Sequence, residues 1–136
     1  MRILMLEWDS FAHEHVMQEL RKADCEVDIF HFPFGSEDMH DNEPLYHRLM
    51  ERLKEEKYDF AFSFNFFPIA AKACNVRNVK YAAWIYNTPF LLRYSKYAML
   101  DTNYIFFFDK SLFYDFKRNG LKNAFYLPMA APVDYY

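Results

Sequence analysis

Four short polar segments stand directly after apolar runs of the sequence, and their side chains are the ones that could do chemistry. They are residues 7–10 (EWDS), 65–68 (NFFP), 87–89 (NTP) and 109–111 (DKS). Carboxylates, amides and hydroxyls in such places can hydrogen-bond a polar molecule and move its protons. Asp9 is the candidate general base, and an exposed cap or salt bridge is the alternative role for this carboxylate.

The candidate substrate-binding residues share one property, a place at the end of a predicted strand. They are Trp8, Ser10, Asn65, Phe66, Phe67, Asn87, Thr88, Asp109 and Lys110. The amide of Asn65 offers two donors and an acceptor, which suits a hydroxyl-rich acceptor better than a phosphate. Phe66 and Phe67 would form an apolar wall for a ring face, and we expect these rings to be exposed. The structural alternative is that Asn65 only caps the next helix, because asparagine is a preferred capping residue.

The elements that must position these residues alternate along the chain. Short apolar runs predict strands, and apolar residues at helical spacing predict helices between them. The predicted strands are 2–7, 26–31, 58–64, 80–86, 103–108 and 123–127, and the predicted helices follow Ser10 and cover 45–53, 67–75 and 111–118. Residues 90–100 (FLLRYSKYAML) are amphipathic enough for a further helix, packed on its own sheet or forming an interface.

Strand and helix alternation with short links implies parallel strands joined by right-handed crossovers. We therefore predict an α/β fold, an open Rossmann-like three-layer sandwich with a mostly parallel sheet of five to six strands. The most apolar strands, the third and fourth, are expected at its centre, which gives the order 2-1-3-4-5 with the sixth strand beyond the fifth. Ligands of such folds bind at the carboxyl ends of the strands, where the strand order reverses.

Length and composition limit the class of protein. The 136 residues, 53% of them hydrophobic, suffice for one domain over residues 1–127, with 128–136 starting a linker or tail. A net charge of −3 favours no nucleic-acid partner. The apolar runs are too short for a membrane span, and residues 1–10 form a strand, not a signal peptide. Cys25 and Cys74 are expected to be reduced thiols of a cytoplasmic protein.

Several kinds of site have no support in the sequence. The two glycines, Gly35 and Gly120, do not follow the first strand, where a dinucleotide fingerprint or a P-loop needs them. His13 and His15 would point to different sides of a helix, and the acidic loop around His40 is more typical of a solvated surface than of a metal site. We therefore expect neither a metal nor a cofactor in this chain.

Five segments, in this order and spacing, resemble a known family. They are MRILMLEWDSF, YDFAFSFNFFP, KYAAWIYNTP, YIFFFDKSLFYDFKRNG and YLPMAA. Together they are similar to the N-terminal domain, known as DUF3880, of bacterial glycosyltransferase-like proteins of the spore-maturation CgeB type, which have the GT-B fold. The resemblance covers essentially the whole chain. Asn87 and Thr88 depart from it, since the family pattern leads us to expect an acidic and a small residue there.

The resemblance implies a protein of two Rossmann-like domains, of which this chain is the one that faces the acceptor. A sugar or another hydroxyl-bearing molecule would be the acceptor. The nucleotide-sugar donor would bind to the C-terminal GT-B domain, which is not in this chain and would be its partner. We therefore expect the isolated chain to be inactive as a glycosyltransferase.

A second hypothesis comes from the same strand ends. The chain has the size of a bacterial receiver domain, and Glu7, Asp9, Thr88 and Lys110 match the types of its magnesium ligands, switch hydroxyl and phosphate-pairing lysine. The position of the phosphorylated carboxylate, however, holds Asn65. An amide cannot replace that nucleophile, so the chain could only be a pseudo-receiver or a protein-interaction module.

Overall fold

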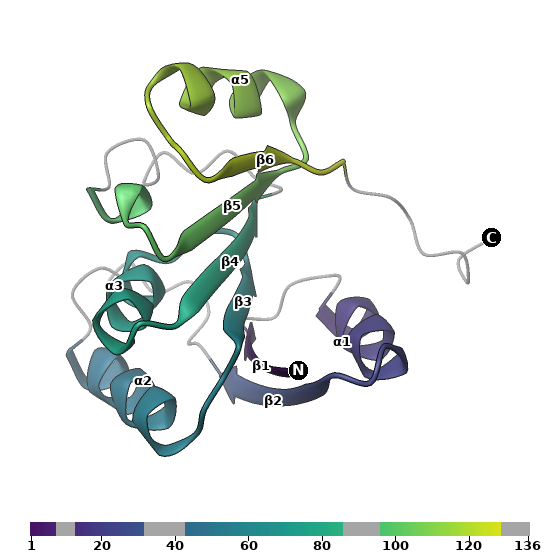
Figure 1. Cartoon of the computed structure of the whole chain (residues 1–136), viewed down its shortest axis with the longest axis vertical. Helices are drawn as coiled ribbons and strands as arrows, with labels where there is room; N and C mark the ends of the chain where they lie inside the picture. Colours follow the sequence, from purple (N-terminus) through teal and green to yellow (C-terminus); the bar gives the residue numbers. More distant parts are fainter. Residues whose placement is uncertain (8–12, 32–42, 86–95, 129–136) are drawn as a thin grey trace.

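The six strands form one parallel sheet in the order β2-β1-β3-β4-β5-β6 in a computed structural model of the chain (Figure 1). The structure describes residues 1–7, 13–31, 43–85 and 96–128. The strands are β1 (Arg2–Glu7), β2 (Glu26–His31), β3 (Phe60–Phe64), β4 (Lys80–Ile85), β5 (Asn103–Phe107) and β6 (Ala124–Tyr126). The predicted fold class and strand order are therefore confirmed, including the sixth strand at the edge beyond the fifth.

Helices fill the connections between the strands. They are α1 (His13–Lys22), α2 (Glu43–Glu55), α3 (Pro68–Arg77), the short 3-10 helix η2 (Lys96–Met99) and α5 (Lys110–Arg118). Pro68 suits the first turn of α3 because its ring fixes φ near the helical value. Asn78 ends the same helix in the left-handed conformation, with φ of 57°. Of the helix predicted over 90–100, the described part contains only η2.

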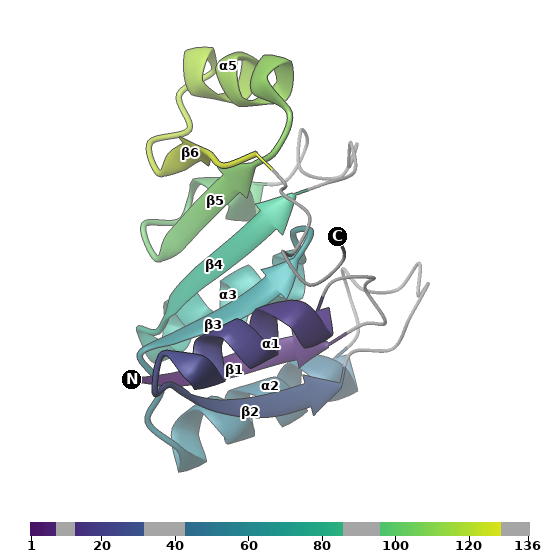
Figure 2. The ribbon, with the colours of Figure 1, turned by 90° about the vertical axis from the view of Figure 1, so that its right-hand side faces the viewer.

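The reversal of strand order at β1 decides which face each helix covers. The step from β1 to β2 runs in one direction across the sheet, and every later step runs in the other. Right-handed crossovers must then place α1 on one face and the helices after it on the opposite face. Figures 1 and 2 show this arrangement, with α1 beside β1 on one side and α2 and α3 on the other.

The main core lies between the sheet and α2, α3 and α5. Alternate residues of each strand point into it, as the pleat of a strand requires. Its largest fully buried members include Tyr81, Phe107, Leu45 and Leu49. This layer positions the ends of β3, β4 and β5, from which the predicted site residues extend.

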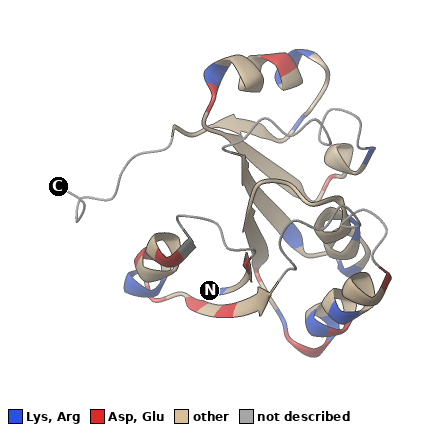
Figure 3. Cartoon of the chain, turned by 180° about the vertical axis from the view of Figure 1, so that it is seen from behind, with Lys and Arg blue, Asp and Glu red and all other residues tan. Residues whose placement is uncertain are grey.

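The opposite face of β3 to β6 is aromatic. Phe64 stacks on Trp84 with ring centroids 5.6 Å apart, and Phe125 stacks on both Phe106 and Tyr104. Among the described elements, α1 is the helix on this face, and it lies near β1, away from β4 to β6 (Figure 2). Charged residues lie mainly on the helices and on β2, while β3, β5 and β6 contain none (Figure 3).

Candidate functional site

The described site residues lie at the carboxyl edge of the sheet. Phe64 pairs in register with Trp84, and the next residue of β4, Ile85, pairs with Phe107. The segments that follow β3 and β5 therefore leave the sheet at the same edge, and they carry the predicted residues Asn65 and Asp109. The other predicted residues, Trp8, Asp9, Ser10, Asn87 and Thr88, lie outside the described part of the chain.

Asn65 has an unusual backbone conformation, with φ of 62°. This left-handed region is costly for residues with a β-carbon, and asparagine is one of the few that adopt it readily. Its N–H still donates to the carbonyl of Trp84 at 2.8 Å, so the β3–β4 ladder continues through this residue. Directly after it the chain turns away from the sheet, with the Asn65 side chain half-buried.

The alternative role of Asn65 as a helix cap is wrong. Helix α3 begins at Pro68, and its N-cap is Phe67, which offers no side-chain acceptor to the first turn. Asparagine is favoured both at N-caps and in left-handed turns, so its presence alone could not separate the two roles. The structure assigns it to the turn.

Two buried hydroxyls fix the shape of this turn from inside the core. Ser63 Oγ donates to the carbonyl of Asn65 at 2.8 Å and lies 2.6 Å from Tyr81 Oη. The N–H of Phe67 donates to the same Tyr81 oxygen at 3.2 Å. Since the Ser63 proton is used on Asn65, the Tyr81 hydroxyl must be the donor in the contact between them. Each hydroxyl thus donates once and accepts once. The hydrogen bonds run in one direction, from the N–H of Phe67 through Tyr81 and Ser63 to the carbonyl of Asn65.

Burial makes this network costly to break. Ser63 and Tyr81 are both completely buried. Burial raises the pKa of Tyr81, so its hydroxyl stays protonated and available as a donor over the whole neutral range. The sequence analysis missed both residues, although one signal was present. Ser63 is a polar residue in the middle of the aromatic strand FAFSF, where a packing role alone would favour an apolar side chain.

The aromatic wall predicted at this edge is only partly present. Phe66 is 5% exposed and packs on Tyr81 with ring centroids 5.8 Å apart, so the expectation of an exposed ring is wrong for this residue. The left-handed turn at Asn65 directs Phe66 into the core. Phe67 is half-buried and packs against the same core. Exposed apolar side chains occur instead at Phe125, Tyr126 and Leu127 of the β6 region and at Tyr114 of α5, each between 42% and 53% exposed.

Asp109 has a clear structural role at the start of α5. Its Oδ1 accepts from the N–H groups of Ser111 at 2.8 Å and Leu112 at 3.2 Å, which makes it the N-cap of that helix. Lys110 follows it as the first residue of the helix and is exposed.

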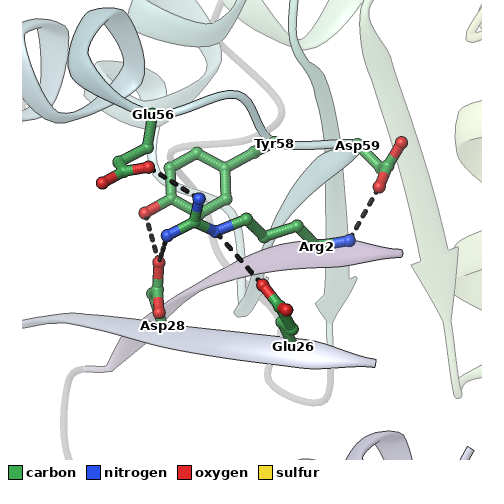
Figure 4. Close-up of polar contacts among 6 residues, drawn as sticks. All are labelled: Arg2, Glu26, Asp28, Glu56, Tyr58 and Asp59. Atoms are coloured by element: carbon green, nitrogen blue, oxygen red, sulfur yellow. Dashed lines mark hydrogen bonds and ion pairs between the residues drawn. The ribbon is translucent and has the colours of Figure 1, made fainter. Parts of the chain in front are cut away.

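A second polar cluster, which the sequence analysis did not find, joins β1 and β2 to the segment between α2 and β3 at the opposite edge (Figure 4). The Arg2 guanidinium contacts Asp28 at 2.8 Å, Glu56 at 2.6 Å and Glu26 at 3.8 Å. The Tyr58 hydroxyl donates to Asp28 at 2.8 Å. This hydrogen bond, followed by the contact with Arg2, lowers the pKa of Asp28.

The Arg2 cluster has a structural role, because it connects β1 and β2 to the segment that precedes β3. Burial and the hydrogen bond to Asp28 raise the pKa of Tyr58 to about 12.

Within residues 1–7, 13–31, 43–85 and 96–128, no group of three or more His, Cys, Asp or Glu side chains is arranged to hold a metal ion. The helices of the same ranges include none with the length and apolar character that crossing a membrane requires.

Comparisons with known proteins place the fold and leave the family open. No protein-family model matches the chain, and no curated protein matches it. Among solved structures, it is similar to MurG of Acinetobacter baumannii, with a TM-score of 0.68 at 12% sequence identity. The similarity covers 98% of this chain and 47% of that protein, so the chain spans about half of its length.

Proposed function

We propose that the chain is the acceptor-side domain of a two-domain glycosyltransferase-like protein with the GT-B fold. The observation that carries the proposal is the similarity to MurG, a GT-B glycosyltransferase, over 98% of the chain. The five segments similar to the CgeB-type N-terminal domain support the same class. A receiver-like domain would share the strand order 2-1-3-4-5, so the similarity to MurG is what favours the glycosyltransferase hypothesis.

In this proposal the carboxyl edge of the sheet binds the acceptor. The turn after β3 presents Asn65 in a shape fixed by Ser63 and Tyr81, and a preorganised group of this kind loses little entropy when it binds a hydroxyl. Asp9 would act as the general base on the acceptor hydroxyl. Trp8, Ser10, Asn87, Thr88, Asp109 and Lys110 would complete the edge.

A second domain would bring the nucleotide-sugar donor to this edge. The exposed apolar residues of β6 and of the position after it, among them Phe125 and Leu127, offer a surface that such a domain could cover. Holding donor and acceptor together is worth roughly 7–11 kcal/mol of the barrier. The isolated chain should therefore transfer no sugar, although it contains the acceptor edge.

The first test uses the isolated chain with a panel of nucleotide sugars and simple saccharide acceptors. Release of nucleoside diphosphate is measured, and we expect no turnover above the rate without protein. Clear turnover by the pure chain would show that donor and acceptor both bind here, and the assignment of this domain to the acceptor side would then be wrong.

The second test uses a two-domain protein that contains this sequence. Asn65→Gly removes the amide and keeps the left-handed turn, so it should raise the KM for the acceptor about three- to tenfold, the value of one or two hydrogen bonds. The KM for the donor should not change. Asn78→Gly is the matched control, because Asn78 has nearly the same backbone conformation, φ of 57°, at the other end of α3. An effect of Asn65→Gly on the donor alone, or equal effects of both variants, would contradict the proposal.

A further inference from the structure

The end of the molecule formed by α5 and β6 concentrates positive charge. Residues 110–128 contain one acidic side chain, Asp115, and four basic side chains, those of Lys110, Lys117, Arg118 and Lys122. All four basic residues are exposed, and Figure 3 shows Lys and Arg at both ends of α5. Over the longer segment 96–128 the basic residues still outnumber the acidic ones, by five to three. Because the whole chain has a net charge of −3, this end differs in sign from the remainder.

Three of these basic residues gather where α5 ends. Lys117 Nζ donates to the carbonyl of Lys122 at 3.1 Å, which brings Lys117 close to the turn before β6. Arg118 forms an ion pair with Asp115 at 3.6 Å, and pairs between exposed groups of this kind are weak. The carboxylate of Asp109 lies at the other end of the helix, where it caps the first N–H groups. The positive charge at the end of α5 is therefore available to an anionic partner.

Two tyrosine rings are exposed beside this charge. Tyr114 is 53% exposed and Tyr126 is 43% exposed. The half-buried ring of Phe113 contacts both, with centroids 5.2 Å from Tyr114 and 6.2 Å from Tyr126. Tyr114 lies four residues before Arg118 in α5, a spacing that places both side chains on one face of a helix. The rings and the basic residues therefore form one continuous surface.

This surface is distinct from the apolar one that a second domain could cover. Successive residues of a strand point to opposite faces of the sheet. Tyr126 lies on the α5 side, against Phe113, whereas Phe125 stacks on Phe106 and Tyr104 on the opposite face. Both surfaces can therefore be occupied at the same time.

We propose that this α5 surface, formed by Tyr114, Lys117, Arg118, Lys122 and Tyr126, binds the face of a lipid bilayer that carries anionic headgroups. Lysine and arginine are attracted to the negative potential of such a face. A tyrosine is apolar at its ring and polar at its hydroxyl, which suits the boundary between headgroups and acyl chains. A soluble polyanion would match the charges but would offer no apolar layer to the rings.

The position of α5 fits a flat partner. The helix forms one end of the described structure along its longest axis, so a bilayer can reach it without meeting α1, α2 or α3 (Figures 1 and 2). The inference does not depend on the proposed glycosyltransferase function, because these five residues are not among the candidate site residues.

The test mixes the chain with vesicles and measures the fraction that sediments with them. Vesicles of equal parts phosphatidylcholine and phosphatidylglycerol are compared with vesicles of phosphatidylcholine alone, at about 0.01 M salt, where the Debye length is about 30 Å. We expect a partition coefficient at least tenfold higher with phosphatidylglycerol, and a fall of at least tenfold in about 1 M salt. Equal partition into both kinds of vesicle, or no sedimentation at lipid concentrations up to about 10 mM, would overturn the proposal.

Charge variants locate the binding surface. The double variant Lys117→Gln/Lys122→Gln should lower the partition coefficient about 25-fold, since each basic residue near the bilayer contributes about fivefold. The matched control is Lys54→Gln/Lys57→Gln, which makes the same change of charge at two exposed lysines at the end of α2 and after it, and should change partition less than twofold. Equal losses in the two double variants would show that only the net charge matters, and the α5 surface would then be the wrong assignment.

Tyrosine variants decide between a bilayer and a soluble polyanion. Tyr114→Ser/Tyr126→Ser keeps every charge and should lower the partition coefficient at least threefold, because two rings leave the boundary of the acyl chains. Both side chains are exposed, so circular dichroism should show an unchanged fold. Partition that needs the lysines but is unchanged in this variant would mean that the surface recognises charge alone, as an acidic protein or a nucleic acid presents it, and the bilayer would be the wrong partner.

Discussion

The left-handed turn at Asn65 makes a prediction about stability that reverses the usual order of alanine and glycine. Alanine normally stabilises a chain relative to glycine, by about 0.4–1 kcal/mol, because it restricts the unfolded state. At φ of 62°, however, the β-carbon of alanine costs about 1–2 kcal/mol in the folded state, and glycine avoids this cost. The difference leaves Asn65→Gly more stable than Asn65→Ala by about 1 kcal/mol.

The comparison between the two variants isolates the backbone. Any interaction that the Asn65 amide makes is lost in both, so it cancels in their difference. For a domain of 136 residues, about 1 kcal/mol corresponds to a difference of roughly 3–5 °C in Tm. Urea denaturation followed by circular dichroism measures the free energy of unfolding directly, with an unchanged slope if both variants unfold in the same two-state manner.

Asn78 calibrates the measurement. It has φ of 57° and ψ of 44° and ends α3, so the pair Asn78→Gly and Asn78→Ala should show the same order and a similar gap. If alanine equals or exceeds glycine at position 65 while glycine is better at position 78, the turn after β3 does not have the left-handed conformation. The preorganised hydroxyl-binding group proposed above would then lose its basis.

Four other perturbations test the polar contacts. Tyr81→Phe should cost about 1–3 kcal/mol of unfolding free energy, because the partly buried N–H of Phe67 loses its acceptor. A double-mutant cycle with Ser63→Ala should give a coupling energy of at least about 0.5 kcal/mol, and simple additivity would contradict the one-directional network. The folded pKa of Asp28 is lowered, so its contribution to stability is complete above its ordinary pKa of 3.8 and is lost as the pH falls further. Asp28→Asn should therefore lower the free energy of unfolding at neutral pH, and this loss should shrink when unfolding is measured in acid. A loss that stays constant with pH would refute this. The folded pKa of Tyr58 is raised to about 12, so its contribution is complete below 10 and should be lost as the pH rises through 12, which spectrophotometric titration can follow in parallel with unfolding. Asp109→Ala should lower the free energy of unfolding by about 1 kcal/mol, because α5 loses its N-cap, and Asp109→Asn should lower it much less. Equal losses in the two variants would indicate that the charge of Asp109 itself is needed.

The fold could be predicted because its signals are periodic and local. Short apolar runs separated by helical segments define parallel strands, and the right-handed crossover then restricts the strand order to few choices. Strand ends were predicted to within two residues, as at β3, which begins at Phe60 and not at Tyr58. That precision suffices to place Asn65 and Asp109 at one edge.

The details of the site depend on geometry that no local pattern carries. Asparagine has the same propensity signal for a cap and for a left-handed turn, so Asn65 could not be assigned. The turn then reverses the direction of Phe66, which a continued strand would have placed on the same face as Phe64. The Arg2 cluster depends on the register between β1, β2 and β3, because its hydrogen-bonded partners are separated by 26 to 57 positions in the sequence and meet only in the folded sheet.

The way in which the chain leaves β6 has a consequence for any segment joined after it. Leu127 is held on both sides, since its N–H donates to the carbonyl of Phe107 at 2.8 Å and its carbonyl accepts from the Trp84 indole at 3.0 Å. Because all six strands are parallel, this anchored exit lies at the same edge of the sheet as Asn65. A domain tethered there through a short flexible linker would be present over that edge at an effective concentration on the order of millimolar. Weak contacts between such a domain and the carboxyl edge would then suffice to cover this edge repeatedly. Because the contacts are weak, the domain would also move away again and let bound molecules exchange.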